Sequence, residues 1–116
     1  MKLLTITCVI LMASISIASA KSMTRSDIEQ NFIGKSLSFV SKKGVTATVR
    51  FSKNGKARLS NTNFSIKSDS GTWKFKGNKH CVSWRKVRSG KEKCFTYKTA
   101  GTGKFKNQDG TILVIK

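Results

Sequence analysis

The chain has 116 residues with no proline, and its 23 basic residues against five acidic ones give a formal net charge of +18. This length leaves room for one domain with a small core, which excludes a multidomain enzyme. The charge favours association with polyanions and excludes an inhibitor of a basic enzyme such as lysozyme, which would repel it. Alternatively, the same net charge simply keeps the protein soluble.

A secretory signal peptide is predicted over residues 1–20. Lys2 supplies the basic start, an uncharged apolar run covers 3–17, and the small-x-small cleavage pattern "ASA" ends at Ala20. The apolar run is too short and wrongly flanked for a membrane anchor. We therefore expect an exported protein, periplasmic or secreted, with no transmembrane segment after cleavage. The mature chain, 21–116, keeps 22 basic and five acidic residues, a net charge of +17.

The mature chain begins with two short predicted elements. Residues 21–25 are polar and predict a flexible tail. In "SDIEQNFIG", Ser26 and Glu29 have the S-x-x-E spacing of a capping box, and Gly34 is suited to end a helix. We expect a short helix over about 26–33 that covers one end of a sheet.

Alternation of apolar and polar residues predicts half-buried strands along the rest of the chain. In "GVTATVRFS" the odd-numbered positions of 45–51 are apolar and the even-numbered ones are polar. Asn54-Gly55 predicts a hairpin in which both residues take a positive φ. The final run, 112–115, lacks alternation, as a strand buried on both faces does.

Seven to eight such strands with regularly spaced turn signals predict a mainly β fold for residues 26–116. The expected architecture is a single domain, a small antiparallel β-barrel or sandwich with a short N-terminal helix. A barrel is favoured because closure removes exposed strand edges.

Aromatic and basic residues interleave in "GTWKFKGNKHCVSWRK", residues 71–86. Strands that stack on RNA bases need rings and charges on one face. Parity instead puts Trp73 and Phe75 on the face opposite the intervening lysines, which disfavours sequence-specific nucleic-acid recognition. The expected core aromatics are Phe51, Trp73, Phe75, Trp84, Phe95 and Phe105. Alternatively, such rings line a pocket for a small apolar ligand.

Two cysteines, Cys81 and Cys94, remain in a chain bound for an oxidising compartment, which favours one bridge between them. A tight two-residue turn at 89–90 would leave them four residues out of step, roughly 13 Å along a strand. That exceeds the limit of about 7 Å between bridged Cα atoms. Either the connection is longer and bulged, or the two cysteines are not bridged directly.

Catalytic residues are poorly represented. The five acidic residues are assigned to a helix start and to turns, and His80 has no identifiable orienting acid. His80 and Cys81 are neighbours on a strand and point to opposite faces, so they do not share a metal ion. We expect no enzyme activity, no metal and no cofactor.

Several short motifs span most of the mature chain. Their residues are Phe51, Asn54, Gly55, Gly71, Trp73, Cys81, Trp84, Cys94 and Phe95. This pattern resembles a group of small bacterial exported proteins of uncharacterised function, in which a G-x-W…C-x-x-W…C-[FY] core follows an F-x-x-[DN]-G hairpin. The resemblance implies a compact periplasmic or secreted β-rich domain with a structural pair of cysteines, and it brings no catalytic residues.

The function expected from these features is non-enzymatic, salt-sensitive association with an anionic polymer or membrane surface. Candidate partners are lipopolysaccharide, an acidic glycan and extracellular nucleic acid, bound by a monomer. The expected basic face consists of Arg50, Lys74, Lys76, Lys79, Arg85, Lys86, Arg88 and Lys91. Two alternatives stay open: a carrier of a small apolar ligand, and a secreted effector that binds a host protein.

Overall fold

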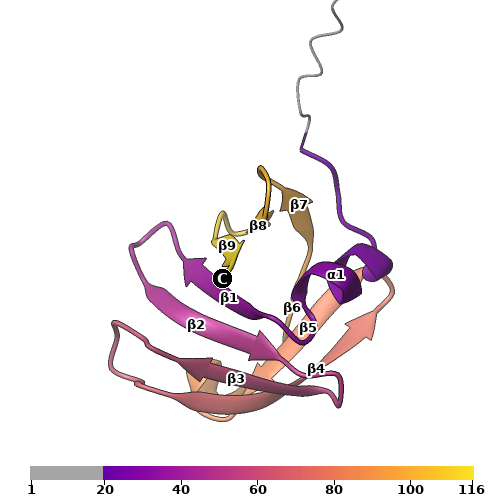
Figure 1. Cartoon of the computed structure of the whole chain (residues 1–116). Helices are drawn as coiled ribbons and strands as arrows, with labels where there is room; N and C mark the ends of the chain where they lie inside the picture. The colour runs from indigo at the N-terminus through magenta and orange to yellow at the C-terminus, as the bar shows by residue number, and fades with distance from the viewer. Residues whose placement is uncertain (1–19) are drawn as a thin grey trace, which may run out of the picture.

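A computed structural model describes residues 20–116, so the predicted signal peptide lies outside the described residues except for Ala20. The described chain is mainly β, with one short α-helix and one short 3₁₀-helix (Figure 1). The elements are α1 (Arg25–Phe32), β1 (Ser36–Val40), β2 (Thr46–Phe51), β3 (Lys56–Ser60), β4 (Asp69–Lys76), β5 (Lys79–Trp84), η1 (Val87–Gly90), β6 (Lys93–Phe95), β7 (Tyr97–Thr99), β8 (Lys104–Asn107) and β9 (Ile112–Ile115).

The strands form one antiparallel sheet in the order β6-β5-β4-β3-β2-β1-β9-β8-β7, which curls into a nearly closed barrel. Its two terminal strands, β6 and β7, are consecutive in the chain and separated only by Thr96. The Gln108 side chain spans this seam, because its Oε1 accepts from the Thr96 N–H at 3.0 Å and its Nε2 donates to the Cys94 carbonyl at 2.8 Å. The predicted barrel is confirmed.

The strand count is nine rather than seven to eight. The segment 93–99 divides at Thr96 into β6, which pairs with β5, and β7, which pairs with β8. This segment forms both edges of the sheet, so it must bend between them. The bend at Thr96 allows the barrel to close.

The helix begins earlier than predicted. Thr24 is its N-cap, and the capping box joins Thr24 to Asp27 rather than Ser26 to Glu29. The preceding residues are not a flexible tail, because the Met23 N–H donates to the Tyr97 carbonyl at 2.9 Å and the Met23 side chain is buried. Pairing with β7 therefore continues up to the residue before the N-cap.

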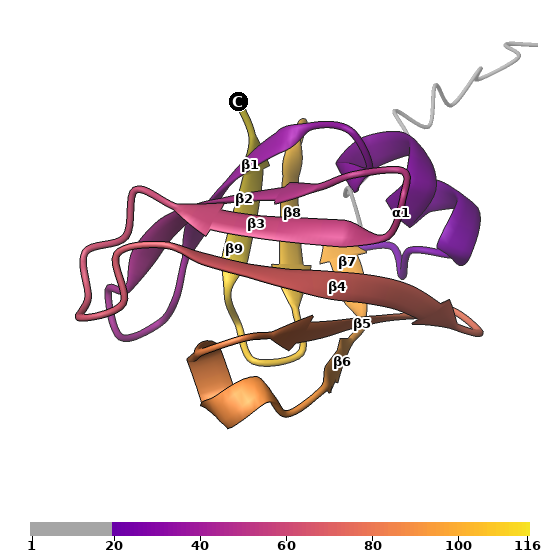
Figure 2. The same ribbon diagram turned by 90° about the horizontal axis from the view of Figure 1, so that it is seen from below.

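Helix α1 closes one end of the barrel (Figure 2). Its Ile28 and Phe32 side chains are 0% exposed. The Phe32 ring packs edge-on against Tyr97, with centroids 4.7 Å apart, and against Phe105 at 5.0 Å. Full burial of such side chains stabilises the fold by roughly 2–3 kcal/mol each. The apolar face of α1 thus fills that end, and open space within the barrel lies elsewhere.

The β2–β3 hairpin confirms the predicted alternation but not its turn. Ala47, Val49 and Phe51 are buried, whereas Arg50 is exposed. Three residues connect the Ser52–Lys56 pair, and of these only Gly55 has a positive φ, +83°. The expectation of a positive φ at Asn54 is therefore wrong, because a three-residue connection needs one left-handed position where a two-residue turn needs two.

Strand β9 also differs from the expectation of burial on both faces. Leu113 is buried, but Ile112, Val114 and Ile115 are half-buried. The strand follows the same inside and outside alternation as its neighbours, and its outward side chains are apolar without being covered by a second layer.

The β5–β6 connection resolves the cysteine register. Cys81 lies directly opposite Cys94, and the two form a disulfide, as predicted. Of the alternatives left open by the sequence, the longer connection is confirmed: it runs from 85 to 92 and contains η1. This extra length brings the cysteines into step. The connection lies at a distance from α1 (Figure 2).

Candidate functional site

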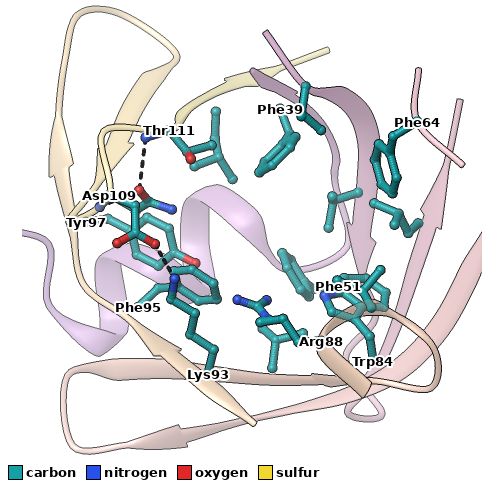
Figure 3. A pocket seen from close by; sticks show the side chains of 17 residues that line it. Phe39, Phe51, Phe64, Trp84, Arg88, Lys93, Phe95, Tyr97, Asp109 and Thr111 are labelled. Atoms are coloured by element: carbon teal, nitrogen blue, oxygen red, sulfur yellow. Dashed lines mark hydrogen bonds and ion pairs between the residues drawn. The ribbon is translucent and has the colours of Figure 1, made fainter. Parts of the chain in front are cut away.

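A pocket of about 460 Å³ opens into the barrel interior beside η1 (Figure 3). Its size falls within the usual range for sites that hold small ligands. The wall is predominantly apolar, with a few charged and polar groups at the mouth. The lining residues are Phe39, Val45, Val49, Phe51, Leu59, Phe64, Val82, Trp84, Val87, Arg88, Lys93, Phe95, Tyr97, Asn107, Asp109, Thr111 and Leu113.

Aromatic rings shape the inner part of the pocket. Phe51 and Tyr97 line it, and behind them lies His80, whose side chain is 0% exposed. The His80 ring packs against Phe51 with centroids 4.4 Å apart and against Trp73 at 5.4 Å. Burial raises the pKa of Tyr97 well above its ordinary value, so its hydroxyl stays neutral. These rings give the pocket a rigid apolar floor.

Charged groups gather at the pocket mouth around the Phe95 ring. The Arg88 guanidinium carbon and the Lys93 Nζ each lie 5.4 Å from its centroid. Lys93 also forms an ion pair with Asp109, which the β8–β9 turn carries. Arg88 has no ion-pair partner within residues 20–116, and Figure 3 shows its guanidinium directed into the pocket beside Lys93. The mouth therefore carries an excess of positive charge.

Arg88 is exposed as a residue, but its guanidinium is partly buried. Burial lowers the pKa of Arg88 below its usual value, and the nearby Asp109 carboxylate partly opposes that effect. The residue remains cationic at any physiological pH, since an unperturbed arginine titrates above about 12. The apolar surroundings instead strengthen its interaction with any anion that enters.

The connection that carries Arg88 is strained and firmly held. Arg88 and Ser89 both adopt the left-handed conformation, with φ of +54° and +53°. Each such non-glycine residue costs about 1–2 kcal/mol, and such strain is often found at ligand-binding positions. The Asp69 carboxylate anchors the start of the connection by accepting the N–H groups of Lys86 at 3.0 Å and Val87 at 2.9 Å.

Asp69 is buried, and its ionised form is nevertheless favoured. Burial alone would raise the pKa of this carboxyl, but hydrogen bonds from the backbone N–H groups of Val87, Lys86 and Ser70 lower it below its ordinary value of 3.8. The sequence suggested only a turn residue here. The disulfide, just beyond the other end of the connection, provides the second anchor.

Asn107 organises the opposite side of the mouth. Its Oδ1 accepts the N–H groups of Asp109 at 2.9 Å and Thr111 at 3.0 Å, so one buried amide shapes the turn between β8 and β9. This turn places the Asp109 carboxylate against Lys93 (Figure 3). No sequence signal predicted that Asn107, Asp109 and Lys93 border the same pocket as Arg88.

The predicted basic face divides into separate groups. Lys74, Lys76 and Lys79 lie on the outer face of β4 and β5, where Glu92 pairs with the first two. Arg85, Lys86 and Lys91 lie exposed along the β5–β6 connection. Arg88 belongs to the pocket mouth rather than to an outer face.

A row of arginines crosses the outer face of β2 and β3 and continues to Arg85, the first residue after β5. Arg50 lies directly opposite Arg58, a residue that the sequence analysis missed. Ser70 on β4 lies opposite Arg58 and accepts a backbone hydrogen bond from Arg85 at 3.0 Å. None of these three arginines forms an ion pair within the described part of the chain. Like charges directly across strands are destabilising unless something neutralises them.

Of the expected core aromatics, Phe51, Trp84 and Phe95 line the pocket. Phe51, Trp84 and Phe105 are buried, and Trp73, Phe75 and Phe95 are half-buried against the core. Cys81, Cys94 and Glu92 form a group that could in principle hold a metal ion. Both sulfur atoms of that group are in the disulfide, so no thiolate is available to bind one.

No family model, curated protein or solved structure matches the chain. The resemblance to small bacterial exported proteins therefore stays a prediction. Among residues 20–116, no helix has both the length and the apolar character needed to cross a bilayer.

Proposed function

We propose that this protein is an exported, non-enzymatic β-barrel that binds a small apolar ligand in its interior pocket. The observation that supports this most directly is the apolar pocket of about 460 Å³. The interior side chains could simply have filled this space, but they leave it open. A core packed only for stability leaves few voids larger than a water molecule. The predicted signal peptide and the disulfide support an oxidising, extracytoplasmic compartment.

The pocket changes the ranking of the functions considered from the sequence. A surface that binds polyanions needs no interior space, whereas a carrier of apolar molecules depends on it. The wall offers rings and aliphatic side chains rather than paired acid and base groups, which supports binding rather than catalysis.

Titration with the uncharged fluorescent probe N-phenyl-1-naphthylamine tests the proposal. We expect saturable binding at one site, abolished by Val45→Trp and by Val87→Trp, two substitutions that fill the pocket from different sides. Val114→Trp, on the outer side of β9, is the matched control and should leave binding unchanged. Equal binding by all variants, or no binding by the unmodified protein, would contradict the proposal.

Association with a polyanion is the second candidate, favoured by Arg50 and Arg58, which lie opposite each other and form no ion pair within residues 20–116. Binding to lipopolysaccharide, DNA and a sulfated glycan should then weaken steeply as salt increases. Arg58→Gln should weaken all three interactions, and Lys106→Gln, which removes the same charge from an exposed position on β8, should change them less. Absence of binding at low salt would reject this candidate and leave the lysines as a solubilising coat.

A further inference from the structure

The pocket mouth has one cation more than its anions can neutralise. Lys93 and Asp109 pair with each other, and Arg88 has no ion-pair partner among residues 20–116. The other acidic residues are engaged elsewhere: Asp27 caps α1, Glu29 pairs with Arg25, Asp69 anchors η1 and Glu92 pairs with lysines of β4. No acidic side chain of the described chain is therefore free to neutralise Arg88.

The surroundings of Arg88 make this charge imbalance energetically unfavourable. Its guanidinium lies over the Phe95 ring and faces a wall that is largely apolar (Figure 3). A cation withdrawn from water is destabilised unless an anion pairs with it. Burial accordingly lowers the pKa of Arg88 below its usual value. An incoming anion would remove this penalty.

The backbone of Arg88 is held in place before any ligand arrives. Asp69 holds the two residues that precede it, the disulfide closes the hairpin behind it, and its own backbone is held in the left-handed region. A group held in place loses little freedom on binding, so more of the interaction contributes to affinity. A planar guanidinium in this position can bind two oxygen atoms of a carboxylate or a phosphate at once.

We propose that the ligand is a single-chain amphiphilic anion, whose head group binds Arg88 at the mouth while its apolar chain extends inward toward Phe51 and Tyr97. This inference rests on the proposed binding function and adds the chemistry of the ligand to it. The arrangement follows from the placement of polar groups at one end only, since the inner wall gives a charged head no partner. The excess positive charge favours a head with one or two negative charges.

Isothermal titration calorimetry with dodecanoate, dodecyl phosphate and dodecan-1-ol tests the inference, each below the concentration at which it aggregates. The two anions should bind more tightly than the alcohol. Arg88→Gln should weaken the anions by roughly 10- to 100-fold, as expected for loss of a hydrogen-bonded charge, and leave the alcohol nearly unchanged. Whichever anion loses more affinity identifies the preferred head group.

Two further variants separate this effect from general attraction to a basic protein. Arg85→Gln removes an equal charge three residues away on the outer surface and should have little effect. Arg88→Lys keeps the charge without the planar fork and should give an intermediate loss. Unchanged unfolding midpoints for the Arg88 variants confirm that the fold is intact.

The possible failures are distinguishable. If all three probes bind the unmodified protein equally, or if Arg88→Gln and Arg85→Gln weaken the anions equally, the head-group inference is wrong while the apolar pocket stands. If none of the three probes binds, both this inference and the proposed binding function are wrong.

Discussion

The Nδ1 atom of His80 lies 2.9 Å from the hydroxyl oxygen of Tyr97, inside the barrel and out of contact with solvent. The other ring nitrogen, Nε2, has no hydrogen-bond partner within residues 20–116. Aromatic rings, among them Phe51 and Trp73, occupy the remaining space around the imidazole. A charged imidazolium would there lack both water and a carboxylate, so the neutral ring is favoured.

This environment predicts that acid destabilises the fold through His80. Burial lowers its pKa from 6.5 to about 4. Between these values the unfolded chain binds the proton more readily, so stability is complete above pH 6.5 and falls as pH decreases toward 4. The expected loss over this window is about 3 kcal/mol. Urea unfolding at pH 7.5, 6, 5 and 4.5 measures it.

His80→Gln provides the control, because glutamine does not titrate. The variant should be less stable at neutral pH, since it disturbs the packing around Tyr97, but its stability should change little between pH 7.5 and 4.5. A pH slope as steep as that of the unmodified protein would show that other groups cause the acid sensitivity.

Local sequence patterns predicted the inside and outside faces well but placed boundaries less well. Alternation over 45–51 identified the buried face of β2, because side-chain parity is a property of any strand. At the helix start two capping-box spacings overlap, Thr24 with Asp27 and Ser26 with Glu29. The helix starts with the Thr24–Asp27 capping box because Met23 is fixed by its pairing with Tyr97. That pairing joins distant segments of the chain, so local spacing does not encode it.

The disulfide should contribute about 3 kcal/mol, because it closes a short loop in the unfolded chain. Cys81 and Cys94 are separated by 13 residues. Thermal unfolding with and without dithiothreitol should show a lower midpoint for the reduced protein. The double variant Cys81→Ala, Cys94→Ala should unfold near the reduced midpoint and respond to no reductant. A midpoint independent of reduction would mean that the bridge makes no net contribution.

The pocket and its mouth were the parts that the sequence could not locate. The inward aromatics were identified, but whether such rings fill a barrel or leave space depends on strand tilt and on how far α1 enters. Arg88 was assigned to the basic outer face together with the other cations of its segment. The left-handed residues of η1 redirect it, and non-glycine residues give no local signal for that conformation.

Asp69 should be essential for the shape of the β5–β6 connection. Asp69→Ala removes the carboxylate oxygen that accepts the backbone N–H groups of Lys86 and Val87. Leaving buried donors without acceptors costs about 1–3 kcal/mol. Amide hydrogen exchange at Lys86 and Val87 should accelerate, whereas exchange at Phe51 on β2 should follow only the global loss of stability. Unchanged exchange at the two donors would contradict this role.

Gly71 should tolerate no side chain, although its neighbours on β4 do. A Cβ atom built at this position overlaps the Ser83 carbonyl oxygen on β5 and lies 3.0 Å from the Trp84 Cα, so the two strands would have to separate. Both contacts are with backbone, which cannot move aside as a flexible side chain can. Gly71→Ala should therefore destabilise the protein by about 1–3 kcal/mol or more.

Ser70→Ala, at the adjacent exposed position, is the matched control and should stay within about 0.5 kcal/mol of the unmodified protein. Because Trp84 lines the pocket, displacement of β5 should also weaken binding of N-phenyl-1-naphthylamine. Equal stability of the two variants in urea would show that β4 and β5 do not approach as closely at Gly71 as described.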